Sequence, residues 1–277
     1  MGKVKSKDVE AHLINGAKVY IGNSSNMSDI PDNSVNLIIT SPPYWTLKDY
    51  ETEDQIGLGS NSYEHYLNEL NKVWFECVRV LAPDGKLCIN IMPFLLTGKA
   101  ARFDRRETRL VLGDIEKALN ETNQMYQFGL FIWDKRKIAR FSSFGSYPFP
   151  PNIFSTYPYE WITVFSKKGK RIKPTPENKE KSKLTTKEWQ DWAINSIWEM
   201  QPAKAKSEGH PAPFPDEMPM RLIKLYSFYG DTVLDPFGGT GTTAKMALKL
   251  GRKAIVYELN SDYLPLIKKK LEKVELL

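Results

Sequence analysis

Two apolar runs that end in stiff, Pro- or Gly-rich turns constrain the fold of this chain most strongly. The run Val35–Ile39 leads into Ser41-Pro42-Pro43-Tyr44, and Thr232–Leu234 leads into Asp235-Pro236-Phe237-Gly238-Gly239-Thr240-Gly241. Short β-branched runs bounded by Pro and Gly are typical of buried strands. Open α/β sheets bind ligands at the carboxyl ends of their strands. The two junctions therefore predict one binding edge that is shared by distant parts of the chain.

The other apolar segments alternate between strand and helix patterns. Strands are predicted at 17–21, 35–39, 86–91, 127–133, 161–165, 232–234 and 253–257, and helices at 63–81, 108–119, 218–229, 240–250 and 261–272. This alternation predicts an α/β fold, with a mostly parallel, Rossmann-like sheet of seven strands flanked by helices. A proline-containing segment at 134–158 and a basic, Trp-rich segment at 167–209 interrupt the pattern. We interpret 167–209 as a small insert in a single domain formed by 1–166 and 210–277.

The composition is that of an ordinary globular protein, with 41% hydrophobic and 26% charged residues. No apolar stretch approaches the roughly 20 residues that span a bilayer, and residues 1–7 lack an apolar secretory segment. We therefore expect a cytoplasmic protein without membrane contact. Cys77 and Cys88 have no Cys or His neighbour at metal-ligand spacing and are predicted to be buried free thiols. The three histidines are scattered, so no metal site is expected.

The turn Ser41-Pro42-Pro43-Tyr44 suits the chemistry of an amine on a nucleobase. The lone pair of such an amine is delocalised into the ring. Two hydrogen-bond acceptors placed off the ring plane can draw both N–H bonds toward them, which makes the nitrogen lone pair available for attack. The Ser41 hydroxyl and the Pro42 carbonyl can be these acceptors, and Pro43 stiffens the turn because proline fixes φ. Tyr44 can stack on a base that has left its duplex. The structural alternative is a stiff turn in which Tyr44 only fills a groove.

The second junction has the features of a cofactor turn. Glycines at 238, 239 and 241 allow the backbone to approach a ligand closely. The turn lacks the complete Gly-x-Gly-x-x-Gly pattern and has no following Lys-Ser/Thr pair, which disfavours a nicotinamide cofactor and a nucleoside triphosphate. Glu258 ends the next predicted strand, where a carboxylate can accept hydrogen bonds from both hydroxyls of a ribose. The alternative is a tight strand-to-helix connection without a ligand.

Basic residues provide candidate contacts to a polyanion. The formal net charge is +6, which is compatible with nucleic-acid binding without proving it. The candidates for contacts to the DNA backbone are Lys135, Arg136, Lys137, Arg140, Lys168, Lys170 and Arg171. A solvated basic face is the alternative. The Trp-rich piece around Trp189, Trp192 and Trp198 is predicted to pack on the core, although contact with DNA remains an alternative.

Taken together, these residues resemble the β-class exocyclic-amino DNA methyltransferases. The Ser-Pro-Pro-Tyr form looks like the N4-cytosine type, whereas the N6-adenine type usually has Asp in place of Ser41. The order of the motifs also matches that class, with the catalytic motif first, a recognition insert in the middle and the cofactor motif last. Asp235-Pro236-Phe237-Gly238-Gly239-Thr240-Gly241 is the most specific element. The likeness covers most of the chain and implies the class I methyltransferase fold with permuted motif order.

The resemblance implies S-adenosylmethionine as cofactor and duplex DNA as substrate. The catalytic residues would be Ser41, Pro42, Pro43 and Tyr44, and the cofactor would be bound by Asn23, Phe214, Pro215, Asp235, Pro236, Phe237, Gly238, Gly239, Thr240, Gly241, Thr242 and Glu258. Relatives often have Asp where this chain has Asn23, whose amide oxygen can accept the same hydrogen bond. The insert 167–209 would be the target-recognition region.

The expected function is transfer of a methyl group to the N4 amine of a flipped cytosine, in a restriction-modification system. The absence of a Pro-Cys nucleophile argues against methylation at cytosine C5. Methylation of adenine at N6 is the closest alternative, since both bases carry an amine beside a ring nitrogen. A non-catalytic DNA-binding subunit and a methyltransferase for RNA or a protein amide are further alternatives. Relatives are often dimers, so a homodimer is a candidate assembly.

Overall fold

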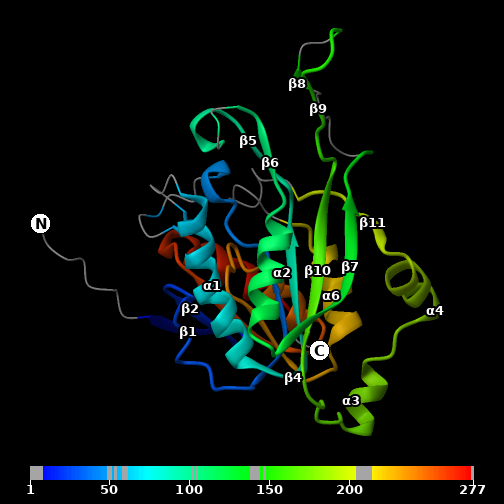
Figure 1. The fold of residues 1–277 in the computed structure, drawn as a ribbon. Coiled ribbons are helices and arrows are strands. Elements are labelled where there is room, and N and C mark those ends of the chain that lie inside the picture. Colours follow the sequence, from blue (N-terminus) through cyan, green and yellow to red (C-terminus); the bar gives the residue numbers. More distant parts are fainter. Residues whose placement is uncertain are drawn as a thin grey trace, which may run out of the picture.

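A nine-stranded sheet forms the centre of the molecule (Figure 1). The computed structural model describes residues 9–48, 52, 55–57, 62–101, 103, 105–137, 144–145, 148–203 and 214–275. The strand order is β1-β2-β13-β12-β3-β4-β10-β7-β11. The bounds are β1 Glu10–Ile14, β2 Ala17–Ile21, β3 Val35–Thr40, β4 Leu81–Ile91, β7 Met125–Asp134, β10 Tyr159–Lys167, β11 Ile197–Glu199, β12 Thr232–Asp235 and β13 Lys253–Glu258.

All seven predicted strands are present, and β1 and β11 extend the sheet at its two edges. Strands β2, β13, β12, β3 and β4 run parallel to their neighbours in this series. Strand β10 runs antiparallel to both β4 and β7, so β7 points in the same direction as β4. The edge at which β2, β3, β4, β7, β12 and β13 end is called the carboxyl edge below. Strand β10 begins at this edge.

Helices cover both faces of the sheet (Figure 1). Helices α1 (Tyr63–Val80) and α2 (Val111–Glu121) pack on one face, and α6 (Glu217–Tyr226), α7 (Thr242–Lys249) and α8 (Leu264–Leu271) pack on the other. Strand β3 contributes to both cores, because Ile38 packs with the α1 side and Leu37 and Ile39 with the α7 side. Its near-continuous apolar sequence is what a strand buried on both faces requires.

Local signals explain where several elements begin and end. The Ser62 hydroxyl accepts a hydrogen bond from the His65 amide and caps the start of α1. Helix α1 ends directly before β4, and Asp84 near the start of that strand has a φ of +59°. Helix α2 begins three residues after its predicted start, since residues 107–109 form the short strand β6 (Glu107–Arg109) against β5 (Phe94–Leu96). Strand pairing therefore overrides the helical pattern there.

The segment predicted as an insert joins the main sheet. It contains α3 (Pro176–Lys181), α4 (Thr186–Glu188), the π-helical turn η3 (Trp189–Ile194) and strand β11, which pairs with β7. Trp198 is buried and stacks on Phe131 with ring centroids 4.4 Å apart, which confirms packing for this residue. Trp192 packs against the same core, whereas Trp189 is 57% exposed. The boundaries 167–209 stay a prediction.

A narrow hairpin of β8 (Phe144–Gly145) and β9 (Ile153–Phe154) projects beyond the carboxyl edge (Figure 1). The short helical turns η1 (Trp45–Leu47), η2 (Gly98–Ala100) and η4 (Ser261–Tyr263) complete the described elements. Within the described ranges, none of the helices combines the length and apolar character that crossing a membrane requires.

Candidate functional site

One pocket at the carboxyl edge joins the two predicted junctions. Ser41 and Pro43 line it from the end of β3, and Pro236, Phe237, Gly238, Gly239 and Thr240 line it from the turn after β12. Its volume is about 910 Å³, including space that is open to solvent. The predicted residues Asn23, Phe214, Thr242 and Glu258 also line this pocket. The sequence-based expectation that residues far apart in the chain share one binding edge is therefore met in the structure.

Tyr44 and Pro42 lie beneath the pocket surface rather than on it. Both are buried, and Tyr44 is 6% exposed, with its ring edge-on to Phe94 at a centroid distance of 6.1 Å. The Tyr44 hydroxyl lies 3.0 Å from Ser41 Oγ. The Pro43 carbonyl accepts a hydrogen bond from the Tyr66 hydroxyl at 2.8 Å, which ties the turn to α1. The turn is thus held rigidly, and Ser41 and Pro43 are the members of the motif that line the pocket.

Asp235 organises the turn from inside the protein. Its carboxylate accepts hydrogen bonds from the hydroxyls of Thr40 (2.8 Å) and Thr243 (2.7 Å) and from the Phe237 amide (3.1 Å). It is 1% exposed and is not among the residues that line the pocket. Burial raises the pKa of this carboxyl to about 6. The geometry therefore favours a positioning role for Asp235 over the predicted direct contact with a cofactor.

Glycines are required where the cofactor turn meets β13. A Cβ on Gly238 would lie 2.1 Å from Val256 Cγ1, so no larger residue fits without a shift of the turn or of β13. Gly239 and Gly241 have φ values of +52° and +81°, which L-residues adopt at a cost. Gly241 is also the residue before α7. The turn can therefore lie against the sheet with its backbone toward the pocket, as close approach to a ligand requires.

Glu258 places a carboxylate in the wall of the pocket, next to the cofactor turn. Its oxygens accept hydrogen bonds from the Gly239 amide at 2.6 Å and the Asn260 amide at 2.8 Å. Burial raises the pKa of this carboxyl to about 7, and the nearby Asp235 adds to the shift. Each oxygen can accept a further hydrogen bond. The group is consequently placed to receive donors from a ligand such as the hydroxyls of a ribose.

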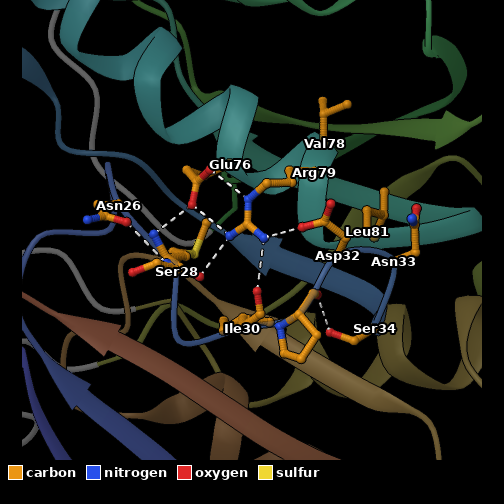
Figure 2. A network of polar contacts seen from close by, with 12 residues as sticks. Asn26, Ser28, Ile30, Asp32, Asn33, Ser34, Glu76, Val78, Arg79 and Leu81 are labelled. Carbon is orange, nitrogen blue, oxygen red and sulfur yellow. Dashed lines mark hydrogen bonds and ion pairs between the residues drawn. The ribbon is translucent and has the colours of Figure 1, made fainter.

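The segment that follows β2 forms another wall and is anchored by Arg79. Asn23 lines the pocket, and its Oδ1 accepts from the Ser25 amide at 2.9 Å. Arg79 on α1 donates to the carbonyls of Met27 (2.8 Å) and Ile30 (3.0 Å) and pairs with Glu76 and Asp32 (Figure 2). A guanidinium has five donors in a fixed plane, which allows it to hold several backbone groups at once. Arg79 thus fixes the loop that continues from Asn23.

Several pocket residues are missing from the prediction. They are Gly22, Ser24, Thr52, Gln55, Ile56, Leu259 and Tyr263. Gly22 and Leu259 directly neighbour predicted residues, so extending each motif by one position finds them. Thr52, Gln55 and Ile56 come from a loop without a recognisable pattern, and only the tertiary structure brings them here. Pro215 and Gly241, which are predicted cofactor residues, are not among the lining residues.

The two predicted basic groups lie at opposite edges of the sheet. Lys135, Arg136 and Lys137 follow the end of β7 at the carboxyl edge, beside the site. Lys168, Lys170 and Arg171 follow the end of β10 at the far edge, because β10 runs in the opposite direction. Arg171 pairs there with Asp231. Arg140 lies outside the described residues. The structure therefore brings only the first group to the pocket side, and contact of any of these residues with DNA stays a prediction.

The pocket fits S-adenosylmethionine by the chemistry of its walls. The turn 236–240 offers backbone beside glycines, Glu258 offers a carboxylate for hydroxyl groups, and Phe237 and Phe214 offer apolar surface for a ring or a methylene chain. Phe237 is itself supported edge-on by Trp74, with ring centroids 6.1 Å apart. Among the described residues, no group of three or more His, Cys, Asp or Glu side chains is arranged to hold a metal ion.

Comparison with known proteins identifies the class to which this fold and site belong. Residues 35–269 match the N6/N4 DNA methylase family, and the chain belongs to this family. It is 34% identical to the type II methyltransferase M.MjaI of Methanocaldococcus jannaschii, over 92% of this chain and 90% of that protein. It is 32% identical to the type II methyltransferase M.MthZI of Methanothermobacter thermautotrophicus, over 92% of this chain and 76% of that protein.

Solved structures agree with this assignment. A putative DNA modification methylase of Thermus thermophilus, in complex with S-adenosyl-L-methionine, is 32% identical, with a TM-score of 0.74 over 91% of this chain and 92% of that chain. The cytosine-N4-specific PvuII DNA methyltransferase shares the fold, at 18% identity and a TM-score of 0.65 over 94% of this chain and 87% of that chain. The predicted class I methyltransferase fold is confirmed, and the predicted type of enzyme and its methyl donor are confirmed at the level of the family.

Proposed function

We propose that this chain transfers a methyl group from S-adenosylmethionine to the N4 amine of a cytosine in duplex DNA. The observation that carries the proposal is the shared pocket, in which Ser41 and the turn 236–240 line one space. A methyl donor held at the turn and an amine held at Ser41 would then lie next to each other. Proximity and orientation of this kind supply much of the rate of a single displacement.

The residues that would hold the cofactor are those whose chemistry suits its parts. Glu258 would accept from the ribose hydroxyls, and the backbone at 238–240 would approach the chain that carries the sulfonium. Asn23 would accept a hydrogen bond from the adenine amine, and Phe214 and Phe237 would border the ring and the methylene groups. When bound, the cofactor supplies an electrophilic methyl group, and the protein supplies the positions of both reactants.

Ser41, which lines the pocket, would bind the amine of the target base, and the backbone carbonyl of the neighbouring, buried Pro42 would be the second acceptor. Two acceptors that draw both N–H bonds leave the nitrogen lone pair free to attack the methyl group. The target must leave the duplex to reach this pocket, since its amine is otherwise enclosed in the base stack. Tyr44 supports Ser41 from below through its hydroxyl. Ser41 in place of an acidic residue favours cytosine, while adenine N6 presents the same amine chemistry and is the second candidate.

Lys135, Arg136 and Lys137 are the proposed contacts to the DNA backbone on the side of the pocket. The segment 167–209 is the proposed recognition region, and its strand β11 lies beside β7, from which these three residues follow. We further propose that the protein acts in the cytoplasm as the modifying partner of a type II restriction system, and that it assembles as a homodimer. Ultracentrifugation of the protein with and without duplex DNA tests the last of these points.

The function is tested by incubating the full chain with mixed duplex DNA and S-adenosylmethionine, followed by modification-sensitive sequencing. Digesting the same DNA to nucleosides and weighing them by mass spectrometry separates N4-methylcytosine from N6-methyladenine. We expect N4-methylcytosine at one short sequence. N6-methyladenine would replace the N4 assignment by the second candidate. DNA that stays unmodified while the protein binds S-adenosylmethionine would refute DNA as the substrate.

A further inference from the structure

A buried carboxylate lies below the site and has no role in the scheme above. Glu160 is 6% exposed and is the second residue of β10, at the carboxyl edge. Three side chains from separate parts of the chain direct donors at it. Asn90 of β4 donates from Nδ2 to Oε2 at 2.5 Å, the Lys135 ammonium pairs with Oε1, and the Tyr44 hydroxyl lies 3.5 Å from Oε2. An ionised carboxylate can only accept hydrogen bonds, so all three groups point a proton toward Glu160.

The position of Glu160 is itself well fixed. The Lys135 ammonium that pairs with it lies 4.1 Å from the centroid of the Trp133 ring. Asn90 is 3% exposed, so its amide group is held in the same buried layer. A buried charge persists only where partners of this kind compensate for its lost hydration. The chain therefore maintains a negative group at this place, below the Ser41 turn.

Glu160 is connected to Ser41 through the hydroxyl of Tyr44. The Tyr44 hydroxyl and Ser41 Oγ are 3.0 Å apart, and either can be the donor. A tyrosine hydroxyl has one proton. If Tyr44 gives its proton to Glu160, then Ser41 must be the donor in the bond between the two hydroxyls. In that case the lone pairs of Ser41 Oγ stay available to accept hydrogen bonds from a ligand in the pocket that Ser41 lines.

We propose that Glu160 is a positioning residue that acts through Tyr44 to hold the Ser41 hydroxyl as a hydrogen-bond acceptor toward the amine of the target base. The inference rests on the proposed function and adds that Glu160 controls the direction in which the Ser41 hydroxyl points its proton. A serine hydroxyl that turned its proton toward the amine nitrogen would occupy the lone pair that attacks the methyl group. The Tyr44–Glu160 contact is long for an O–H···O bond, and contacts of this type tighten in reactive complexes.

The first test measures binding without turnover. Duplex DNA with the site found by sequencing is bound to the full chain in the presence of S-adenosylhomocysteine, which has no methyl group to transfer. A second duplex carries the same ring without its exocyclic amine. The wild-type protein should prefer the amine-bearing duplex about tenfold, the size expected for hydrogen bonds to a buried acceptor. Glu160→Gln should reduce this preference to about twofold or less and leave the affinity for S-adenosylmethionine unchanged.

Glu69→Gln is the matched control. Glu69 is also a partly buried glutamate paired with a lysine, Lys72, but it lies on α1 and outside the pocket. This variant should keep the wild-type preference. Tyr44→Phe removes the connecting hydroxyl without altering Glu160, so it should lose the preference as Glu160→Gln does. This second variant keeps the test decisive if Glu160→Gln does not fold.

A double-mutant cycle separates positioning from general support of the structure. In the Tyr44→Phe background, Glu160→Gln should change neither the preference for the amine nor kcat any further. An effect of Glu160→Gln that persists at full size in that background overturns the proposal, and so does an unchanged preference in the single variant. A wild-type protein that methylates no base amine would instead overturn the proposed function, so the two failures are distinguishable.

Discussion

Thr40 and Asp235, the last residues of β3 and β12, are joined by a side-chain hydrogen bond of 2.8 Å. The residue after Thr40 is the proposed acceptor for the base amine, and the residue after Asp235 begins the cofactor turn. One buried contact therefore sets the distance between the two halves of the site. Because Asp235 also accepts from Thr243 at the start of α7, the helix is held to the same point.

Thr40→Val should weaken this junction. The substitution keeps the shape of the side chain but leaves the buried Asp235 carboxylate with one donor fewer, which costs about 1–3 kcal/mol of unfolding free energy. Urea unfolding followed by circular dichroism measures the loss, and kcat should fall along with it. Thr163→Val is the matched control. The Thr163 hydroxyl is buried without a hydrogen-bond partner among the described residues, so its replacement should be neutral or slightly stabilising. Equal losses in both variants would contradict this assignment.

The pKa of Asp235 predicts a distinct pH dependence of stability. Burial raises the pKa of this group from 3.8 to about 6 in the folded protein. The native state then holds the proton more tightly than the unfolded state. The stability that Asp235 contributes by binding this proton is therefore fully present below about pH 4 and is lost as the pH rises through about 6. Asp235→Asn cannot titrate. The difference in unfolding free energy, wild type minus variant, should fall by at most about 3 kcal/mol across that window. A difference that rises with pH would refute the raised pKa.

Glu258 should link cofactor binding to the release of a proton. The pKa of the carboxyl is raised to about 7 without a ligand, and donors from bound ribose hydroxyls favour the ionised form. Below that pH, binding must displace a proton, so S-adenosylmethionine should bind about tenfold more weakly at pH 6 than at pH 8. Calorimetry in buffers of different ionisation enthalpy measures both the affinity and the proton count. Glu258→Gln should bind weakly at either pH, and proton uptake by the wild type would oppose this role.

Gly238→Ala should disrupt the cofactor turn by a steric clash. The new methyl group would lie 2.1 Å from Val256 Cγ1, so β13 or the turn must move. We expect a loss of about 1–3 kcal/mol in stability and at least about tenfold weaker cofactor binding. Gly113→Ala on α2 is the control, because a Cβ there meets nothing within 4 Å, and a helical Gly-to-Ala change is neutral or stabilising. Val256→Ala should partly restore the Gly238→Ala variant, and no recovery would point to another cause.

The sequence predicts the strands and both motifs because these features are local. An apolar, β-branched run such as Val35–Ile39 is buried in almost any arrangement of this sheet. Pro and Gly occur in the two turns because the backbone conformation at those positions requires them. The same reasoning could not assign Asp235 to the interior. Its role depends on Thr40, which reaches it only after the strands have assembled.

Strand direction explains why the two predicted groups of basic residues lie at opposite edges of the sheet. Strands that are joined by a crossover helix run parallel, and a mostly parallel sheet would lead one to expect the same direction for β10. Among the described elements, however, no helix lies between β7 and β10. A connection without a crossover helix is typical of antiparallel neighbours. That signal places Lys168 and Lys170 at the far edge of the sheet. The contact between Tyr44 and Glu160 has no comparable signal, since it joins residues 116 positions apart.

The two basic groups can therefore be separated by experiment. Arg136→Gln with Lys137→Gln should weaken binding to duplex DNA and make the dependence of affinity on salt less steep, because each lost phosphate contact reduces the slope by about one. The effect should be moderate, since Asp134 and Glu199 already pair with these cations. Lys168→Gln with Lys170→Gln is the matched change in charge at the far edge and should leave affinity and slope unaltered. Fluorescence anisotropy over a range of salt concentrations measures both quantities. If only the second pair lowers the affinity, DNA binds at the far edge and the proposed interface at β7 is wrong.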